Sequence, residues 1–226
     1  MRRALLILSY LSAVLWAGAA WAYDDSPFSP GGSTFLELGR YQTNFDYPDG
    51  DHMAHVGRYG VAFSEPVAND FNLMLHGGYL TLDVDGDPVA SLQDYTGRYL
   101  GLGARYESTE ADHLNFSVQA DYTWHDVNGS SFVLQSEIIW YAALVSAGPV
   151  LRYGPWRVSG GAYYQDIQGN ETDTGPPANQ YRTFSAGSQA GGYFGFSYYV
   201  DTTGSLGVYA TAGARRGINV VFKRDF

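Results

Sequence analysis

Hydrophobic and polar residues alternate with a period of two along much of the chain. In LNFSVQADYTWHD, residues 114–126, every second residue from Leu114 to Trp124 is apolar, and the residues between them are polar. A strand places two such sets on opposite faces, whereas a helix would spread both around its circumference. The stretch HVGRYGVAFSE, residues 55–65, alternates in the same way. The pattern therefore predicts an all-β protein.

The same alternation predicts ten strands. They cover residues 33–43, 55–65, 71–82, 95–107, 113–126, 138–153, 156–168, 182–200, 206–215 and 217–226. The last two segments form one long strand if the RRG at 215–217 is not a turn, so eight strands is the main alternative.

The connections between these strands are of two kinds. Compact turns are expected at 65–70, 107–112, 153–156 and 201–205, and longer polar loops at 44–54, 83–94, 126–137 and 168–181. Short turns at one end and long loops at the other are typical of a transmembrane β-barrel. Tyr and Trp also gather near strand ends, for example Tyr79, Trp124 and Trp140, where bilayer interfaces favour them.

These features together predict a closed, antiparallel, transmembrane up-and-down β-barrel of eight to ten strands. Such a barrel leaves no strand edge unpaired in lipid, so the last strand must pair with the first. A soluble barrel of lipocalin type is the rival prediction, because alternation alone does not say which face is inside.

The first 22 residues have the layout of a secretory signal peptide. Arg2 and Arg3 precede a long apolar run that ends in Ala20-Trp21-Ala22, a small-x-small cleavage site. We therefore expect a signal peptide at 1–22 and a single barrel domain at 23–226, with an uncleaved anchor as the alternative. Beyond residue 22 no apolar run reaches the roughly 18 residues of a membrane-spanning helix, so a crossing there must use strands.

Composition excludes several classes of function. The chain has 13 Lys and Arg against 23 Asp and Glu, a net charge of −10, which argues against nucleic acid as a partner. It has 0 Cys, which excludes disulfides, thiol catalysis and a lipid-modified N-terminal cysteine. We expect no cofactor.

The chain ends INVVFKRDF, a strand-like alternation that stops at Phe226. With the signal peptide and the GLGARY-type strand at 101–106, this end resembles the small outer-membrane β-barrel proteins of Gram-negative bacteria, the OmpA/OmpX-like superfamily. The resemblance implies an outer-membrane location and contact with outer-membrane lipid and lipopolysaccharide. It also implies that the barrel-assembly machinery recognises the last strand and Phe226, and it leaves the oligomeric state open.

The polar faces of the strands predict a charged barrel interior. We place there Glu37, Arg58, Asn72, His76, Arg105, Gln119, Asp121, His125, Glu137, Arg152, Lys223 and Asp225. Charges of both signs in a narrow interior are expected to pair, because an unpaired charge there costs several kcal/mol. The prediction is an interior plugged by ion pairs, with a narrow conduction path or a catalytic cluster as alternatives.

Two motifs carry weaker hypotheses. Asp83, Asp85 and Asp87 alternate in DVDGDP and form a possible divalent-cation loop, although Gly86 and Asp94 do not fit an EF-hand. A solvated turn is the simpler interpretation. Asp121 and His125 share a strand face but lie about 13 Å apart along it, too far for a direct contact.

We assign no catalytic residue and no metal ligand. The sequence favours a non-enzymatic outer-membrane barrel with a structural or surface-interaction role. The alternatives are a narrow channel or conduit for small or apolar molecules and a lipid A-modifying enzyme.

Overall fold

The computed structural model describes residues 32–68, 70–85, 94–108, 113–130, 134–175 and 179–226. Within these ranges the chain is all-β, which confirms the expected fold class. None of the described residues forms a helix with the length and hydropathy needed to cross a membrane. The expected signal peptide at 1–22 lies outside the described residues, as does Asp87.

Eleven strands make up the described chain. They are β1 Ser33–Tyr47, β2 Gly50–Ala68, β3 Phe71–Asp85, β4 Tyr95–Glu107, β5 Leu114–Ser130, β6 Gln135–Tyr153, β7 Trp156–Thr174, β8 Gln180–Ala186, β9 Ala190–Tyr199, β10 Gly204–Gly213 and β11 Arg215–Asp225. The bounds of β4 coincide with the predicted ones, and most other long strands run further than predicted.

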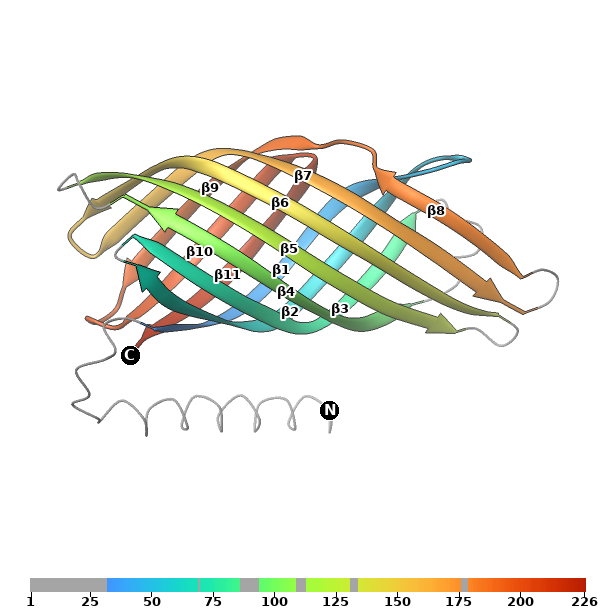
Figure 1. Ribbon diagram of the computed structural model, residues 1–226, viewed down its shortest axis with the longest axis horizontal. Coiled ribbons are helices and arrows are strands. Elements are labelled where there is room, and N and C mark those ends of the chain that lie inside the picture. Colours follow the sequence, from blue (N-terminus) through green and yellow to red (C-terminus); the bar gives the residue numbers. More distant parts are fainter. Residues whose placement is uncertain (1–31, 69, 86–93, 109–112, 131–133, 176–178) are drawn as a thin grey trace.

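Antiparallel pairing closes a ring of ten strands (Figure 1). Neighbours pair in order from β1 to β7, then β7 with β9, β9 with β10, β10 with β11, and β11 with β1. The closing ladder runs from Ser33 opposite Asp225 to Thr43 opposite Arg215. We call the end that carries Ser33 and Asp225 the proximal end, and the opposite end, with the turn at residues 48–49, the distal end.

Between β7 and β1, the wall consists of three strands at the proximal end and of one strand at the distal end. The predicted strand 182–200 is interrupted at residues 187–189, which separates β8 from β9. β9 pairs with the proximal part of β7, and β8 pairs with its distal part. β8 then pairs with β1 through Phe45 opposite Ala186 and Asp46 opposite Ser185. β10 and β11 are short and turn at Ala214. The wall is therefore ten-stranded proximally, but distally it consists of β1 to β7 and β8 (Figure 1). The predicted counts of ten and eight each describe one level of the barrel.

Three of the four long distal loops that the sequence predicts are mostly strand. Of the fourth, 83–94, residues 83–85 belong to β3 and residues 86–93 lie outside the described residues. The segment 44–54 contains only a turn at 48–49, because β1 and β2 continue to Tyr47 and from Gly50. Likewise the loops at 126–137 and 168–181 shrink to 131–134 and 175–179. Their polar residues were read as loop, but in the distal strands polar side chains face water on the outside and apolar ones face inward.

The outward face of the proximal half is apolar and exposed. It includes Phe63, Leu73, Leu75, Leu100, Leu102, Phe116, Val145, Phe194, Val208, Ile218 and Phe222. Aromatic residues border this belt: Tyr59 and Tyr79, Tyr122 and Tyr141 on the distal side, and Trp156 and Tyr198 on the proximal side. An apolar outer belt between aromatic girdles suits a bilayer. It contradicts the lipocalin-type alternative, which requires the apolar face inside.

The interior of the distal half is an apolar core. It consists of Tyr41, Phe45, Tyr47, Ala54, Val56, Leu80, Leu82, Val84, Tyr95, Tyr99, Val127, Ile138, Trp140, Ile167 and Phe184. The Phe45 ring lies 4.4 Å from Phe184 and 5.8 Å from Trp140 between centroids. Gly169 makes this packing possible, because a Cβ there would collide with Phe184 and Trp140. Trp140, expected in a girdle, is thus a core residue, and ion pairs alone do not fill the interior.

Candidate functional site

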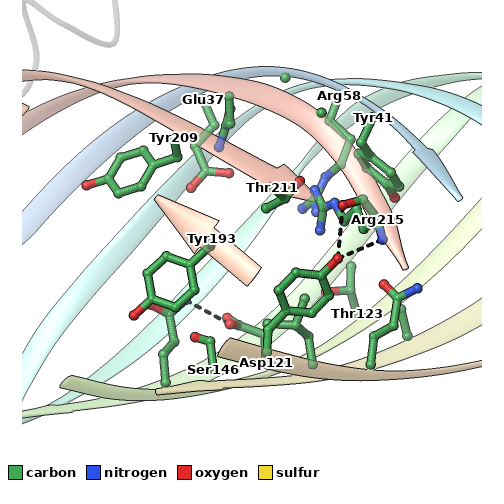
Figure 2. A pocket seen from close by; sticks show the side chains of 18 of the residues that line it. Glu37, Tyr41, Arg58, Asp121, Thr123, Ser146, Tyr193, Tyr209, Thr211 and Arg215 are labelled. Carbon is green, nitrogen blue, oxygen red and sulfur yellow. Dashed lines mark hydrogen bonds between the residues drawn. The ribbon is translucent and has the colours of Figure 1, made fainter. Parts of the chain in front are cut away.

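A cavity of about 260 Å³ lies inside the barrel below the distal core (Figure 2). Inward-facing residues of β1 to β7 and β9 to β11 line it, since every second residue of these strands points to the interior. Its walls are polar and tyrosine-rich; they include Glu37, Tyr41, Arg58, Asp121, Thr123, Ser146, Tyr193, Tyr209, Thr211 and Arg215.

An arginine-rich ion cluster lies at the proximal end of the cavity. The carboxylate of Glu107 is 2.6 Å from Arg105, 2.6 Å from Arg152 and 2.7 Å from Arg157. Arg105 and Arg157 also line the cavity. One carboxylate therefore faces three guanidinium groups, which leaves this cluster positively charged.

Arg58 and Arg215 form the second basic feature of the cavity. The Arg58 guanidinium lies 4.0 Å from the ring centroid of Tyr99, and that of Arg215 lies 3.6 Å from the centroid of Tyr41. Stacking on an aromatic face stabilises a guanidinium without neutralising it. Arg58 also makes a side-chain hydrogen-bond contact to His76 Nδ1, at 3.3 Å.

The acidic residues of the cavity are engaged elsewhere or stand apart. Asp121 accepts a hydrogen bond of 2.7 Å from Gln119 Nε2 and lies 3.8 Å from His76 Nε2. Glu37 faces the cavity from β1 (Figure 2) and forms no ion pair within the described chain. Among the described residues, Arg58 and Arg215 therefore have no carboxylate within ion-pair distance, although Glu37 interacts with both over a longer range. This differs from the expectation of general charge pairing.

A hydrogen-bond network surrounds the β10–β11 turn, where the wall changes from ten strands to eight. The Arg215 amide donates to Tyr163 OH at 2.7 Å, and the Tyr163 hydroxyl lies 2.9 Å from Arg215 O. Gln165 Nε2 donates to Thr43 Oγ1 at 3.1 Å, and Thr43 Oγ1 donates to Ala214 O at 3.1 Å. The polar groups around the β10–β11 turn thus find partners inside the wall.

Most of the charged residues predicted for the interior do face it. The cavity brings together Glu37, Arg58, His76, Arg105, Asp121 and His125. Arg152 joins the Glu107 cluster, and Lys223 lies 2.7 Å from Asp225 at the proximal end.

Glu137 differs from the expectation. It is exposed on the outward face of distal β6, between the buried residues Ser136 and Ile138. The assignment assumed that polar residues face inward along the whole strand. That holds only at the level of the lipid belt.

Three residues of the site were not predicted from the sequence: Glu107, Arg157 and Arg215. Arg157 continues the alternation of the strand that begins at Trp156, and Glu107 is the last residue of β4. Arg215 stands in the RRG segment that was read as a possible turn. Extending the alternation of the last strand back by two residues would have placed it inside.

Two further predictions stay predictions. Asp83 and Asp85 lie on the outward face of β3, and Asp85 accepts a contact of 2.8 Å from His55 Nε2. Within the described ranges no group of three His, Asp or Glu residues could hold a metal ion. The backbone amide of Phe226 donates to Gly32 O at 3.0 Å, and its ring is 49% exposed, available to an assembly factor.

Comparison with known proteins gives a fold but no family. No family model matches the sequence, and no curated protein matches it. The translocator domain of the autotransporter NalP from Neisseria meningitidis is similar in structure, with a TM-score of 0.52 and 8% identity, over 99% of this chain and 98% of that one. The outer membrane protease OmpT from Escherichia coli has a TM-score of 0.50 and 9% identity, over 90% and 99%.

The closed ring, the apolar outer belt and these similarities identify the chain as an outer-membrane β-barrel. The resemblance stated from the sequence is confirmed at the level of the fold, and the outer membrane is the location that this fold implies. The structural neighbours named here include a translocator domain and a protease, so the fold does not define the activity.

Proposed function

We propose that this protein is a closed, non-conducting outer-membrane barrel that acts through the outer surface of its distal section. The observation that carries the proposal is the apolar core of the distal interior, to which all eight distal strands contribute side chains. Phe45, Ile138 and Trp140 are each no more than 1% exposed. Moving an unpaired ion into so apolar a region is strongly unfavourable, so we do not favour the narrow-channel alternative.

The distal outer wall is the surface we propose to be functional. It extends the strands beyond the apolar belt and carries the outward-facing acids Asp46, Asp51, Asp83, Asp85, Glu137 and Asp166. Strand ladders hold these side chains more rigidly than long loops would. An acidic, ordered surface of this kind favours partners that carry positive charge.

A non-enzymatic role fits the polar contacts of this wall better than catalysis. The most clearly formed acid–base pair is His55 with Asp85, and Gln42 Nε2 lies 3.2 Å from the other ring nitrogen of His55. A hydrolase of the Ser/His type needs a hydroxyl bonded to its histidine. Among the described residues, no Ser, Thr or Tyr hydroxyl makes such a bond.

Ion conductance in planar bilayers tests the closed-barrel proposal. We expect the native protein to give no discrete conductance steps. The double variant Trp140→Gly/Phe184→Gly, which removes two core rings, should leak or conduct. The matched control Tyr141→Gly/Tyr181→Gly removes outward rings from the same two strands and should stay closed. Discrete steps from the native protein would refute the proposal.

Binding of polylysine to reconstituted barrels tests the surface role. The variant Asp51→Asn/Asp83→Asn/Asp85→Asn should bind it more weakly than the native protein, with a smaller dependence on salt. Asp201→Asn, in the turn at the proximal end, is the control and should bind as the native protein does in barrels whose distal wall faces the solution. Equal binding by the distal triple variant would count against the distal wall.

A further inference from the structure

We infer that the cavity at membrane level is a binding site for a small oxyanion, a free carboxylate or phosphate that enters from the proximal end. This goes beyond the proposed surface role and rests on a different part of the barrel.

Several arginine donors of the cavity have no acceptor in the described part of the chain. A guanidinium carries five N–H donors. The Nε atoms of Arg58, Arg105 and Arg215 are buried without a hydrogen-bond partner. No side-chain donor of Arg215 has an acceptor among the described residues, although its ring stacking on Tyr41 fixes its position. Buried donors without acceptors are costly, and an oxyanion would satisfy several of them at once.

The charge of the cavity favours the same ligand. Arg58, Arg105, Arg157 and Arg215 line it, and its carboxylates are Glu37 and Asp121. Glu107 adds one negative charge at the proximal end but is shared by three arginines. His76 and His125 also face this space and add no negative charge. The interior is thus positive within a chain whose net charge is −10.

The arrangement of the arginines suits one bound anion. Arg58 on β2 and Arg215 on β11 flank β1, and both lie beside Tyr41 (Figure 2). Two like charges so close in a medium of low dielectric repel one another, and an anion between them would offset that cost. Tyr193 lines the same cavity from β9 (Figure 2).

Volume and access limit the ligand. A cavity of about 260 Å³ is near the lower end of ligand pockets, roughly 300–1,000 Å³, and admits a phosphate or a small carboxylate but no acyl chain. The distal route is closed by the apolar core. At the proximal end the boundary is the polar Glu107 cluster, where the Arg152 side chain is 49% exposed. The ligand therefore comes from the proximal, periplasmic side.

Calorimetric titration of the purified full barrel in detergent tests the inference, with inorganic phosphate and acetate as probes. We expect saturable binding of at least one probe to the native protein. Arg215→Gln and Arg58→Gln should each weaken it about tenfold or more, because each removes a charge-assisted hydrogen bond. Arg216→Gln is the matched control: Arg216 is the next residue along β11 but faces outward and is exposed, so binding should not change.

Three further measurements separate loss of the site from loss of the fold and a free anion from a lipid headgroup. Heat-dependent gel mobility establishes that each variant is folded, and Arg215→Lys should retain part of the binding because it keeps the charge. Short-chain phosphatidylglycerol should not compete with phosphate. Binding of that lipid in preference to phosphate would overturn the assignment to a free anion. No saturable binding of either probe, or equal binding by Arg215→Gln, would mean that only water fills the cavity, and would overturn the inference.

Discussion

Trp140 connects the two halves of the interior at the scale of single residues. Its ring stacks on His125 with centroids 4.4 Å apart and planes at 3°, and it touches Phe45 on the distal side. His125 in turn lines the cavity. The Trp140 side chain thus belongs to the apolar core and also supports His125 at the distal end of the cavity. Its removal should therefore disturb the packing of both regions.

Replacing Trp140 with Ala should lower the free energy of unfolding by roughly 3–5 kcal/mol, the usual cost of removing a large buried aromatic side chain. Tyr141→Ala on the outward face of the same strand, where the side chain is 44% exposed, should cost clearly less. Urea titration of both variants in the same detergent measures the difference. Equal losses would mean that Trp140 is not packed as described.

Glu171 is a buried carboxylate of the distal interior. It is fully buried, lies 2.9 Å from Arg182, and accepts a contact of 3.4 Å from Ser136. Glu171→Gln removes the negative charge of this ion pair with Arg182 and should cost about 3 kcal/mol. Glu137→Gln, an exposed acid on the neighbouring strand, should change stability by less than about 0.5 kcal/mol. The same urea titration separates the two.

At the scale of elements, the decisive feature is the exchange of β9, β10 and β11 for β8. The β1–β8 contact holds only two residue pairs, Phe45 with Ala186 and Asp46 with Ser185, and one backbone bond from Gly187 to Asn44 O at 3.0 Å. This is a short seam between strands far apart in sequence. The distal wall depends on it for closure.

Engineered cysteines test that seam in a chain that has none of its own. Asp46→Cys/Ser185→Cys places two outward-facing residues opposite one another, so a disulfide should form and persist through heating in detergent. The control Asp46→Cys/Gln168→Cys spans two strand spacings, about 10 Å, which is too far for a disulfide. Failure of the first pair to cross-link would contradict the β1–β8 pairing.

Tyr163 holds the end of the β10–β11 hairpin. Tyr163→Phe leaves the amide of Arg215 without its acceptor and should cost about 1–3 kcal/mol. Tyr164→Phe, on the outward face, removes a bond of 2.8 Å to the exposed Gln189 and should cost less. Hydrogen exchange at residues 213–215 should quicken in the first variant alone; unchanged exchange would show that the hydroxyl does not secure the turn.

At the scale of the whole molecule, the barrel has an apolar belt around its proximal half and a polar, acidic wall around its distal half. Both described ends of the chain lie at the proximal end (Figure 1). This arrangement predicts that the distal wall faces the exterior of the cell, with the chain ends in the periplasm.

Cysteine labelling in intact cells tests the orientation. Gln168→Cys on the distal wall should react with a membrane-impermeant maleimide, whereas Thr202→Cys in the proximal turn should react only after the outer membrane is permeabilised. Both residues are exposed in the barrel, so accessibility alone does not separate them. The reverse pattern would place the acidic wall in the periplasm.

The sequence by itself determined most of the strands, which residues of a strand share a face, and the closure of the last strand on the first. Alternation is a local property, because a strand turns successive side chains to opposite faces whatever surrounds it. For that reason Arg58 and Phe63 could be set on opposite faces, and the apolar outer belt of the structure shows that the face of Arg58 is the inner one. The terminal strand needed a partner for its backbone, and β1 provides it.

Only the tertiary structure decided which strands share each level and which charges meet. Glu137 and Trp140 follow the alternation of β6. Outside the barrel, however, the surroundings of β6 change from lipid in the proximal half to water in the distal half. In the distal half polar residues such as Glu137 therefore face outward, and apolar residues such as Trp140 face inward. The meeting of Arg58 with Arg215 depends on the registers of two separate ladders on β1. Those registers are fixed by pairing between strands far apart in sequence, and the size of the cavity depends on the space between the core and the Glu107 cluster. No local sequence pattern encodes either one.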